Sequence, residues 1–366
     1  MRWRCLVTLG LMISLSLAGC GKSYQRLTSE DGVFELASLK ASSARVPLGR
    51  LDVLAEPPGA TPSRVTLRVA DTSTHDRVIV CVHGVFTDHE AWRFTAGALA
   101  PHGDLVLIDL PGCGDSDPAP GGEVGYAPEA LAARILAALE ACPRVSETSS
   151  PIALVAHSFG GLLAIRMFAD EEVRRVYAHL LNRIDRLVLI SPVDVAVEKP
   201  HPFFSQLAYV SVWEVETASI TGRLREAVAR GTLRSVDNRR MALREEADTR
   251  LLVLTDRSRR FALQAMLRQA IPFIDDRPDW AMVEAIESRY GRVDVPCLIL
   301  WGRRDETLPI SMGYKLASQF PDARLVPVPN AKHSPHLEQP SIVNALIAEF
   351  IANGDNTTAS DGTLRR

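Results

Sequence analysis

Short apolar runs recur from about residue 50 onward, and they follow two patterns. The segments RLDVLAE and SRVTLRVA alternate apolar and polar positions, as half-exposed antiparallel strands do. Five later runs are continuously apolar: VIVCVHG, DLVLIDLPG, PIALVAHS, DRLVLISP and PCLILWG. Continuous runs of Val, Ile and Leu are typical of parallel strands that are covered on both faces. The pattern therefore predicts an antiparallel hairpin followed by a parallel sheet.

Helical patterns separate these strands. They lie near 90–100, 126–141 and 159–170, and one more, near 340–352, follows the run RLVPVPN. Strands that alternate with helices indicate an α/β fold with right-handed crossovers. We expect a mostly parallel central sheet with helices on both faces.

One long segment, 195–293, interrupts this alternation with helical patterns and no clear strand. Nearly a hundred residues cannot be a structureless loop within a compact domain. We interpret the segment as a helical cap inserted between two late strands. The cap divides the core into a first part, 51–194, and a second part, 294–352, and the polar residues 353–366 are expected to form a flexible tail.

The N-terminus has the features of an export signal. MRWRCLVTLGLMISLSLAGC begins with two arginines, continues with an apolar stretch too short to span a membrane comfortably, and ends in small residues. Its last four residues resemble the lipobox of bacterial lipoproteins. That resemblance implies cleavage of residues 1–19, a diacylglycerol on the sulfur of Cys20, and a tether over 20–50. It also implies a cell-envelope location, and Gly21 favours sorting to the outer membrane, facing the periplasm. The alternative is an ordinary export signal with an incidental cysteine.

Composition narrows the possible functions. The 366 residues are 46% hydrophobic and carry a net charge of −3, so the chain can bury a large core. Neither a basic stripe nor zinc-finger spacing is present in the sequence, which speaks against nucleic acid as a partner. Four cysteines of the folded part lack metal-site spacing; Cys81 and Cys297 are interpreted as buried small hydrophobes. Those four are Cys81, Cys113, Cys142 and Cys297, and the sequence does not indicate how any would pair.

The segment LVAHSFGGLLAIRMF places Ser158 between a strand and a helix. Small residues two positions before and after it, Ala156 and Gly160, permit a sharp turn that exposes the hydroxyl near a helix N-terminus. Such a turn is a nucleophile elbow. The alternative is a turn that merely links the two elements.

A serine hydroxyl needs a base to remove its proton. His333, in VPNAKHSPHLEQP, follows the last strand-like run and would arrive at the same sheet edge as Ser158. His336 is its competitor, whereas His157 is expected to point away from the serine.

The base in turn needs a carboxylate. Asp305, in LILWGRRDETLP, gives the order Ser–Asp–His, and Asp194, in ISPVD, is the alternative. Asp305 could instead be a solvated turn residue or a partner of Arg303 or Arg304.

An oxyanion requires backbone donors that are already in place. The amide of Phe159 follows the nucleophile, and VHGVFTD offers the amide of Val85 in a turn after an earlier strand. We interpret His83 in that turn as a structural, hydrogen-bonded residue, with a role as a second base as the alternative.

Together, VHGVFTD, DLPGCGDSD, AHSFGG, WGRRD and KHSPHLEQP resemble the ordered motifs of the α/β-hydrolase fold over residues 64–352. The nearest branch is the capped one, with esterases, lipases, perhydrolases and carbon–carbon bond hydrolases. The resemblance implies a catalytic triad, an oxyanion hole and a structural turn in which Ser116 is not a nucleophile. It assigns the triad to Ser158, Asp305 and His333, and the oxyanion hole to Val85 and Phe159. The structural turn would consist of Asp109, Gly112, Gly114 and Ser116. Two positions depart from the pattern, since Ala156 replaces a usual glycine and Lys332 precedes the histidine where glycine is common.

Serine at the nucleophile position favours acyl transfer to water, because haloalkane dehalogenases and epoxide hydrolases of this fold carry aspartate there. We expect a small-molecule ester or acyl substrate, a lipid-anchored enzyme, and no cofactor or metal. Hydrolysis of a C–C bond, amide or lactone, or peroxyacid formation, would use the same triad. A catalytically inactive envelope binding protein is the alternative of another class. The aromatics Phe203, Phe204, Tyr209 and Trp213 would line an acyl site or form the cap's own core.

Overall fold

In the computed structural model of the chain, the described residues are 46–70, 75–193, 207–236, 243–270, 273–274 and 277–353. The predicted signal peptide, Cys20, Asp194, Phe203 and Phe204 lie outside them. Within the described part, none of the helices combines the length and apolar character that a bilayer-spanning segment requires.

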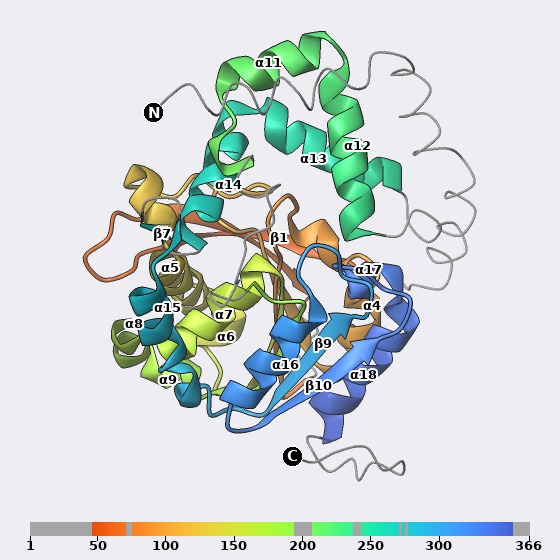
Figure 1. Ribbon diagram of the computed structural model, residues 1–366. Coiled ribbons are helices and arrows are strands. Elements are labelled where there is room, and N and C mark those ends of the chain that lie inside the picture. Colours follow the sequence, from red (N-terminus) through yellow and green to blue (C-terminus); the bar gives the residue numbers. More distant parts are fainter. Residues whose placement is uncertain are drawn as a thin grey trace.

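An eight-stranded, mostly parallel sheet forms the centre of the molecule (Figure 1). Its strand order is β1-β2-β4-β3-β5-β6-β9-β10. The first two strands pair antiparallel with each other, β2 pairs antiparallel with β4, and all other pairs are parallel. The predicted hairpin and parallel sheet are thus confirmed. The strands are β1 (Gly49–Ala55), β2 (Ser63–Ala70), β3 (Val78–Val82), β4 (Asp104–Ile108), β5 (Ile152–His157), β6 (Ile184–Ile190), β9 (Cys297–Gly302) and β10 (Ala323–Val328).

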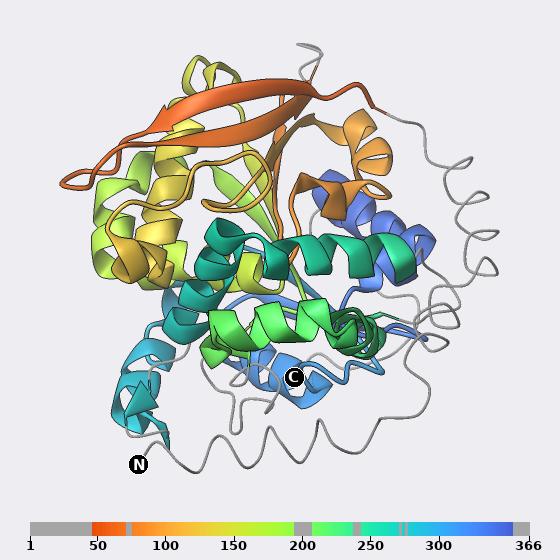
Figure 2. The same cartoon turned by 90° about the horizontal axis from the view of Figure 1, so that it is seen from above.

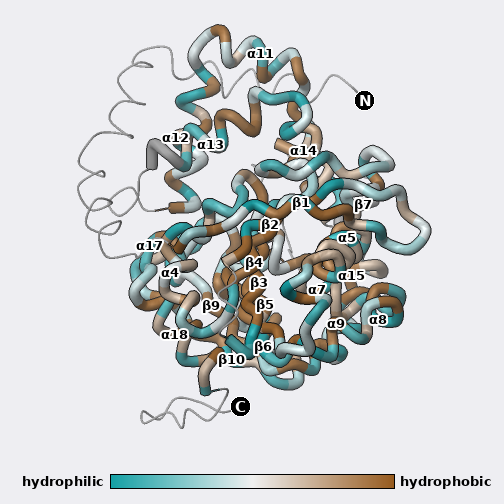
Figure 3. The backbone as a smooth tube through the Cα atoms, turned by 180° about the vertical axis from the view of Figure 1, so that it is seen from behind, coloured by the Kyte–Doolittle hydropathy of each residue, from teal (hydrophilic) through white to brown (hydrophobic). Residues whose placement is uncertain are grey.

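Helices cover both faces of the sheet, because every residue of β3, β4, β5 and β9 is buried and needs apolar partners on two sides (Figure 3). One core layer joins the sheet to α5 (Pro128–Glu140), α7 (Phe159–Ala169) and α16 (Ile310–Gln319). The opposite layer joins it to α4 (Ala96–Leu99) and α18 (Pro340–Asn353). Shorter elements complete the core: η1 (His89–Trp92), η2 (Ala100–His102), η3 (Gly122–Tyr126), α6 (Pro143–Ser146), α8 (Glu171–Val176), α9 (Ala178–Leu181), η4 (Tyr290–Arg292) and α17 (Pro335–Glu338).

Residues 207–270 of the segment between β6 and β9 form a helical layer over one edge of the sheet (Figures 1 and 2), whereas the last helix of the segment, at 280–287, packs into the core of the sheet beside α7 to α9. Seven buried apolar residues hold this cap together, and Val85 and Phe86 of the core pack against them. The cap therefore rests directly on the turn after β3. The elements of the inserted segment are α11 (Val212–Ile220), α12 (Arg223–Ser235), α13 (Leu243–Thr255), α14 (Arg257–Ala270), β7 (Phe273–Ile274), β8 (Arg277–Pro278) and α15 (Trp280–Glu287).

Three details differ from the sequence expectations. The inserted segment holds a two-stranded ladder, β7–β8, whose strands have two residues each and are too short to produce a periodic pattern. Strand β1 begins at Gly49, so two residues assigned to the tether belong to the sheet. Tyr209 and Trp213 are 68% and 71% exposed, so they do not form the cap's core, and neither lines the pocket between cap and core. Among the described residues, none of Cys81, Cys113, Cys142 and Cys297 is in a disulfide, and Cys81 and Cys297 are buried as expected.

Candidate active site

Ser158 occupies a strained turn between β5 and α7. Its φ of 52° and ψ of −117° are unusual for a residue with a side chain. Two hydrogen bonds fix the turn, from the Ser158 amide to Ile190 O at 3.0 Å and from the Val193 amide to Ser158 O at 3.0 Å. A Cβ on Gly160 would lie 2.5 Å from the carbonyl oxygens of Val82 and His83, at the end of β3, so only glycine fits there. Ala156, the departure from the usual glycine, is fully buried without disturbing the turn.

The imidazole of His333 connects the serine to a carboxylate. Its Nε2 lies 2.9 Å from Ser158 Oγ, and its Nδ1 lies 2.9 Å from Asp305 Oδ2. The other oxygen, Asp305 Oδ1, accepts the amides of Thr307 at 2.8 Å and Leu308 at 2.9 Å. The Asp305 side chain is fully buried, so it is not a solvated turn residue. The structure thus brings together the three residues that the sequence singled out.

Gly302, at the end of β9, allows the two loops that carry Asp305 and His333 to meet. A Cβ on Gly302 would overlap the carbonyl oxygen of Lys332. Beside it, the Arg304 amide donates to Ala331 O at 2.9 Å, which joins the two loops. The glycine is part of WGRRD, but its role depends on a contact that the sequence does not reveal.

The histidine loop is also bound by the cap and by a buried carboxylate. The His333 amide donates to Ser235 O, at the end of α12, at 3.0 Å. Lys332 Nζ donates to Leu233 O at 2.7 Å and pairs with Glu306 at 2.9 Å. From the other side, Glu338 accepts the Lys332 amide at 2.9 Å. The lysine that replaces the usual glycine therefore ties the loop to the cap, a contact that sequence analysis missed.

The turn after β3 packs against the nucleophile. A Cβ on Gly84 would lie 2.9 Å from Ser158 Cβ, which places the neighbouring Val85 beside the serine. Phe159 is the first residue of α7, and the first amides of a helix have no acceptor within it. Both residues predicted to form the oxyanion hole thus belong to segments that adjoin Ser158.

His83 holds this turn in place. Its Nε2 accepts the Leu110 amide at 3.0 Å, so the ring proton is on Nδ1 and is donated to Gly84 O at 2.7 Å. Burial lowers the pKa of His83 and keeps it neutral. These bonds explain His83 as a structural residue rather than a second base.

Two further buried imidazoles lie behind His333. His157 Nε2 donates to the carbonyl oxygen of His333 at 3.0 Å, so His157 contacts the loop and not the serine hydroxyl. The His336 ring lies 4.5 Å from that of His157 and 5.1 Å from Trp92, and neither of its nitrogens has a partner among the described residues. Burial lowers the pKa of both, that of His336 to about 3. His333 is therefore the imidazole that reaches Ser158.

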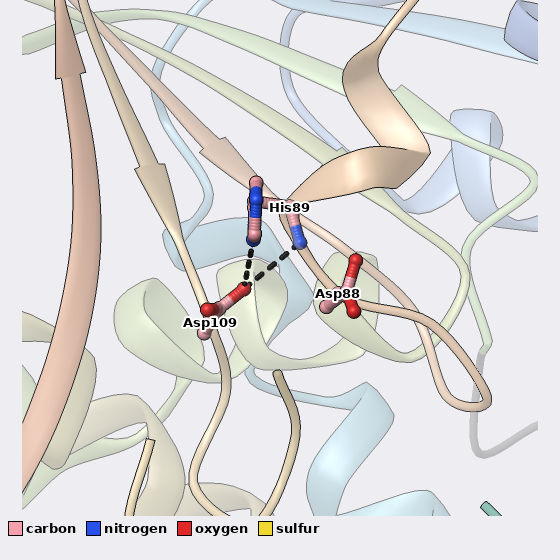
Figure 4. A group of neighbouring side chains, drawn as sticks. All are labelled: Asp88, His89 and Asp109. Carbon is pink, nitrogen blue, oxygen red and sulfur yellow. Dashed lines mark hydrogen bonds and ion pairs between the residues drawn. The ribbon is translucent and has the colours of Figure 1, made fainter. Parts of the chain in front are cut away.

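Asp88, His89 and Asp109 form a third polar group (Figure 4). Asp109 Oδ1 accepts both the amide of His89, at 2.9 Å, and its Nδ1, at 2.8 Å. Burial opposes the charged forms, but this contact raises the pKa of His89 and lowers that of Asp109. A metal ion would have to displace this bond, so the arrangement is explained by anchoring η1 to the end of β4. Ser116 belongs to the same turn, because its Oγ donates to Asp109 O at 2.7 Å.

A pocket lies between the cap and the core, next to Val85. The core contributes the turn after β3 and the glycine-rich turn after β4, and the cap contributes α13 and α14. Its walls are mostly apolar, with Asp88 and Arg259 as the charged members. The lining residues are Val85, Phe86, Thr87, Asp88, Gly112, Cys113, Gly114, Thr249, Val253, Arg259, Leu263 and Met266.

The unpaired His336 provides a test of the buried imidazole cluster. In the unfolded chain a histidine takes up a proton near pH 6.5, whereas buried His336 does so only near pH 3. Stability is therefore expected to fall as pH drops through this window, by at most about 1.4 kcal/mol per pH unit for this group. His336→Phe should unfold no more easily at pH 7 and should lose less stability on acidification, as measured by urea unfolding at several pH values. Equal acid sensitivity in both proteins would contradict this account.

Known proteins similar to this chain include hydrolases of several kinds. Uncharacterized hydrolase YugF of Bacillus subtilis is 22% identical over 286 residues, which are 75% of this chain and 90% of that protein. A thermophilic esterase from Thermogutta terrifontis superposes with a TM-score of 0.59 at 20% identity, over 83% of this chain and 98% of its own. 2-Hydroxy-6-oxo-6-phenylhexa-2,4-dienoate hydrolase from Rhodococcus sp. strain RHA1 does so with a TM-score of 0.62 at 16% identity, over 83% and 99%. At such identities the structural likeness shows the fold alone.

The family model described as the alpha/beta hydrolase family matches residues 79–346, from β3 into α18. This match covers the elbow, both loops that meet at His333, and the cap. Together with the sheet topology it confirms the expected fold class, and the chain is a member of the alpha/beta hydrolase family.

Proposed function

We propose that this hydrolase cleaves carboxylic esters through an acyl-enzyme formed on Ser158. The observation that carries the proposal is the unbroken chain of hydrogen bonds from Ser158 Oγ through His333 to Asp305, both of 2.9 Å. A serine, an imidazole and a carboxylate in this order are the parts that nucleophilic acyl transfer needs.

In the proposed mechanism each proton transfer involves one named atom. As Ser158 Oγ attacks the ester carbonyl, its proton passes to His333 Nε2, and Asp305 stabilises the imidazolium. When the C–O bond breaks, the same proton goes to the departing alcohol. His333 then takes a proton from water, whose oxygen attacks the acyl carbon, and returns it to Ser158 Oγ as the carboxylic acid leaves. The strained φ of Ser158 keeps its hydroxyl at the apex of the turn throughout.

Developing negative charge on the carbonyl oxygen would be stabilised by the amides of Val85 and Phe159. Phe159 lies at the N-terminus of α7, where the helix dipole adds to the effect. None of these steps calls for a cofactor or a metal ion.

Hydrolysis of a C–C bond, an amide or a lactone, or perhydrolysis, would use the same three residues. The similar proteins include both an esterase and a dienoate hydrolase, so the fold is compatible with more than one of these reactions, and the shape and polarity of the pocket would decide which substrate is bound. An inactive binding protein is the remaining alternative, but a buried, fully bonded Asp305 with His333 aligned on the serine favours catalysis. Turnover of p-nitrophenyl esters of increasing chain length, run beside amides and lactones, tests the reaction type.

A first prediction about activity concerns the triad. Ser158→Ala or His333→Ala is expected to lower ester turnover by roughly three to six orders of magnitude, because these residues act as a unit. A fluorophosphonate probe should label the wild type and not Ser158→Ala. His336→Phe is the matched control and should keep its activity. A folded wild type that takes up no probe would favour the binding-protein alternative.

A second prediction concerns the link between Lys332 and the cap. Lys332→Met removes the bonds to Leu233 O and Glu306, so His333 should be held less firmly. We expect kcat to fall by about tenfold with a smaller change in KM, because small displacements of a catalytic group slow the reaction steeply. Lys332→Arg should recover part of the loss.

Lys315 offers a matched control for Lys332. It pairs with Glu287 at 2.7 Å and so also joins the core to the inserted segment, but away from the histidine loop. Lys315→Met should leave kcat unchanged. Equal effects of the two substitutions would mean that Lys332 supports the fold in general and not His333 in particular.

We also propose that the protein is exported and held on the cell envelope by lipid on Cys20, on the outer membrane facing the periplasm where two membranes are present. The support is the lipobox-like ending of the N-terminal segment. Cys20→Ser is expected to move the protein from the membrane to the soluble fraction on cell fractionation. Cys5→Ser, within the same apolar segment, should leave the distribution unchanged. Membrane association that survives Cys20→Ser would refute lipidation.

A further inference from the structure

Arg250, on cap helix α13, is a partly buried cation that forms no ion pair with any described residue. Its Nη1 donates to the neutral hydroxyl of Ser235 at 3.3 Å, while its Nε is buried and has no partner in the described part of the chain. The nearby carboxylate of Glu246 is bound instead by Arg93, at 2.9 Å. Burial lowers the pKa of the Arg250 guanidinium, yet an arginine stays charged.

Arg250 contacts two segments that adjoin Ser158: the turn after β3 and, through Ser235, the loop of His333. Its guanidinium carbon lies 5.7 Å from the ring centre of Phe86, the residue after Val85. Its partner Ser235 is the residue whose carbonyl oxygen accepts the His333 amide at 3.0 Å. On the same helix, Thr249 and Val253 line the pocket between cap and core. Arg250 thus lies between the oxyanion turn and the histidine loop.

We propose that Arg250 is an anion-binding residue of the substrate site and that the enzyme prefers esters that carry a carboxylate. A partly buried guanidinium without an ion pair among the described residues loses hydration, and a carboxylate would offset that cost through charge-assisted hydrogen bonds to Nε and an Nη group. The Phe86 ring, in cation–π contact with the guanidinium, would shield one side of the pair from water. This inference rests on the proposed ester hydrolysis and extends it to a substrate class.

Matched esters test the proposal. The mono-p-nitrophenyl esters of adipate, pimelate and suberate carry a terminal carboxylate, and their methyl-capped diesters are neutral and of similar size. A second pair, 3-(hexanoyloxy)benzoate and its methyl ester, places the carboxylate on the leaving group. The full-length wild type is expected to favour the anionic member of at least one pair by about tenfold or more in kcat/KM.

Arg250→Met should bring the ratio of anionic to neutral kcat/KM to that expected without an anion site, whatever its effect on absolute turnover, and Arg250→Lys should keep part of the preference. The control is Arg257→Met, which removes an 80% exposed cap arginine paired with Glu216 and should leave the preference intact. An equal ratio of anionic to neutral turnover in wild type and Arg250→Met would overturn the proposal.

Calorimetric binding separates this proposal from the proposed reaction. Ser158→Ala should bind monomethyl adipate more tightly than dimethyl adipate, and Ser158→Ala with Arg250→Met should bind both equally weakly. If the wild type hydrolyses no ester but this difference persists, the anion site stands and ester hydrolysis fails. If esters are hydrolysed and neither anionic form is bound or cleaved preferentially, the anion site fails alone.

Discussion

The hydrogen bond between His333 and Ser158 joins residues 175 positions apart in sequence, and the site depends on it. It can form because β5, β9 and β10 run parallel, so that the segments after them meet at one edge of the sheet. The loop after β10 must still reach back past β9 and β6 to the serine. Gly302 makes this possible, since any side chain there would overlap the Lys332 carbonyl.

Packing in the core offsets the strain at Ser158. A residue with a side chain at positive φ costs on the order of 1–3 kcal/mol, and such a turn persists only where its surroundings fix it. All eleven residues of α7 are buried, and β5 is buried throughout, so both arms of the elbow are held rigidly. Apart from Arg166, which pairs with Glu129, the residues of α7 are all apolar, and a helix so nearly apolar on every side is stable only inside the protein, which explains why the elbow lies at the centre of the sheet.

The sequence was sufficient to predict features that depend on local pattern. The apolar runs predicted the strands, and small residues around Ser158 predicted the sharp turn. Contacts between distant loops left no such pattern, which is why Gly302, Glu338 and the partners of Lys332 were missed. The exposure of Tyr209 and Trp213 was misjudged because aromatic residues indicate burial only on average, and the packing of the cap decides individual cases.

The end of α12 brings base positioning and the proposed substrate recognition into one place. Leu233 and Ser235 offer carbonyl oxygens that helix termini leave without intrahelical donors, and Lys332 and His333 supply donors to them. The hydroxyl of Ser235 meanwhile accepts from Arg250. A movement of the cap would therefore shift Arg250, the proposed substrate ligand, together with the loop that carries His333, the proposed base. The cap is, on this view, part of the catalytic assembly, because its backbone helps to set the position of His333.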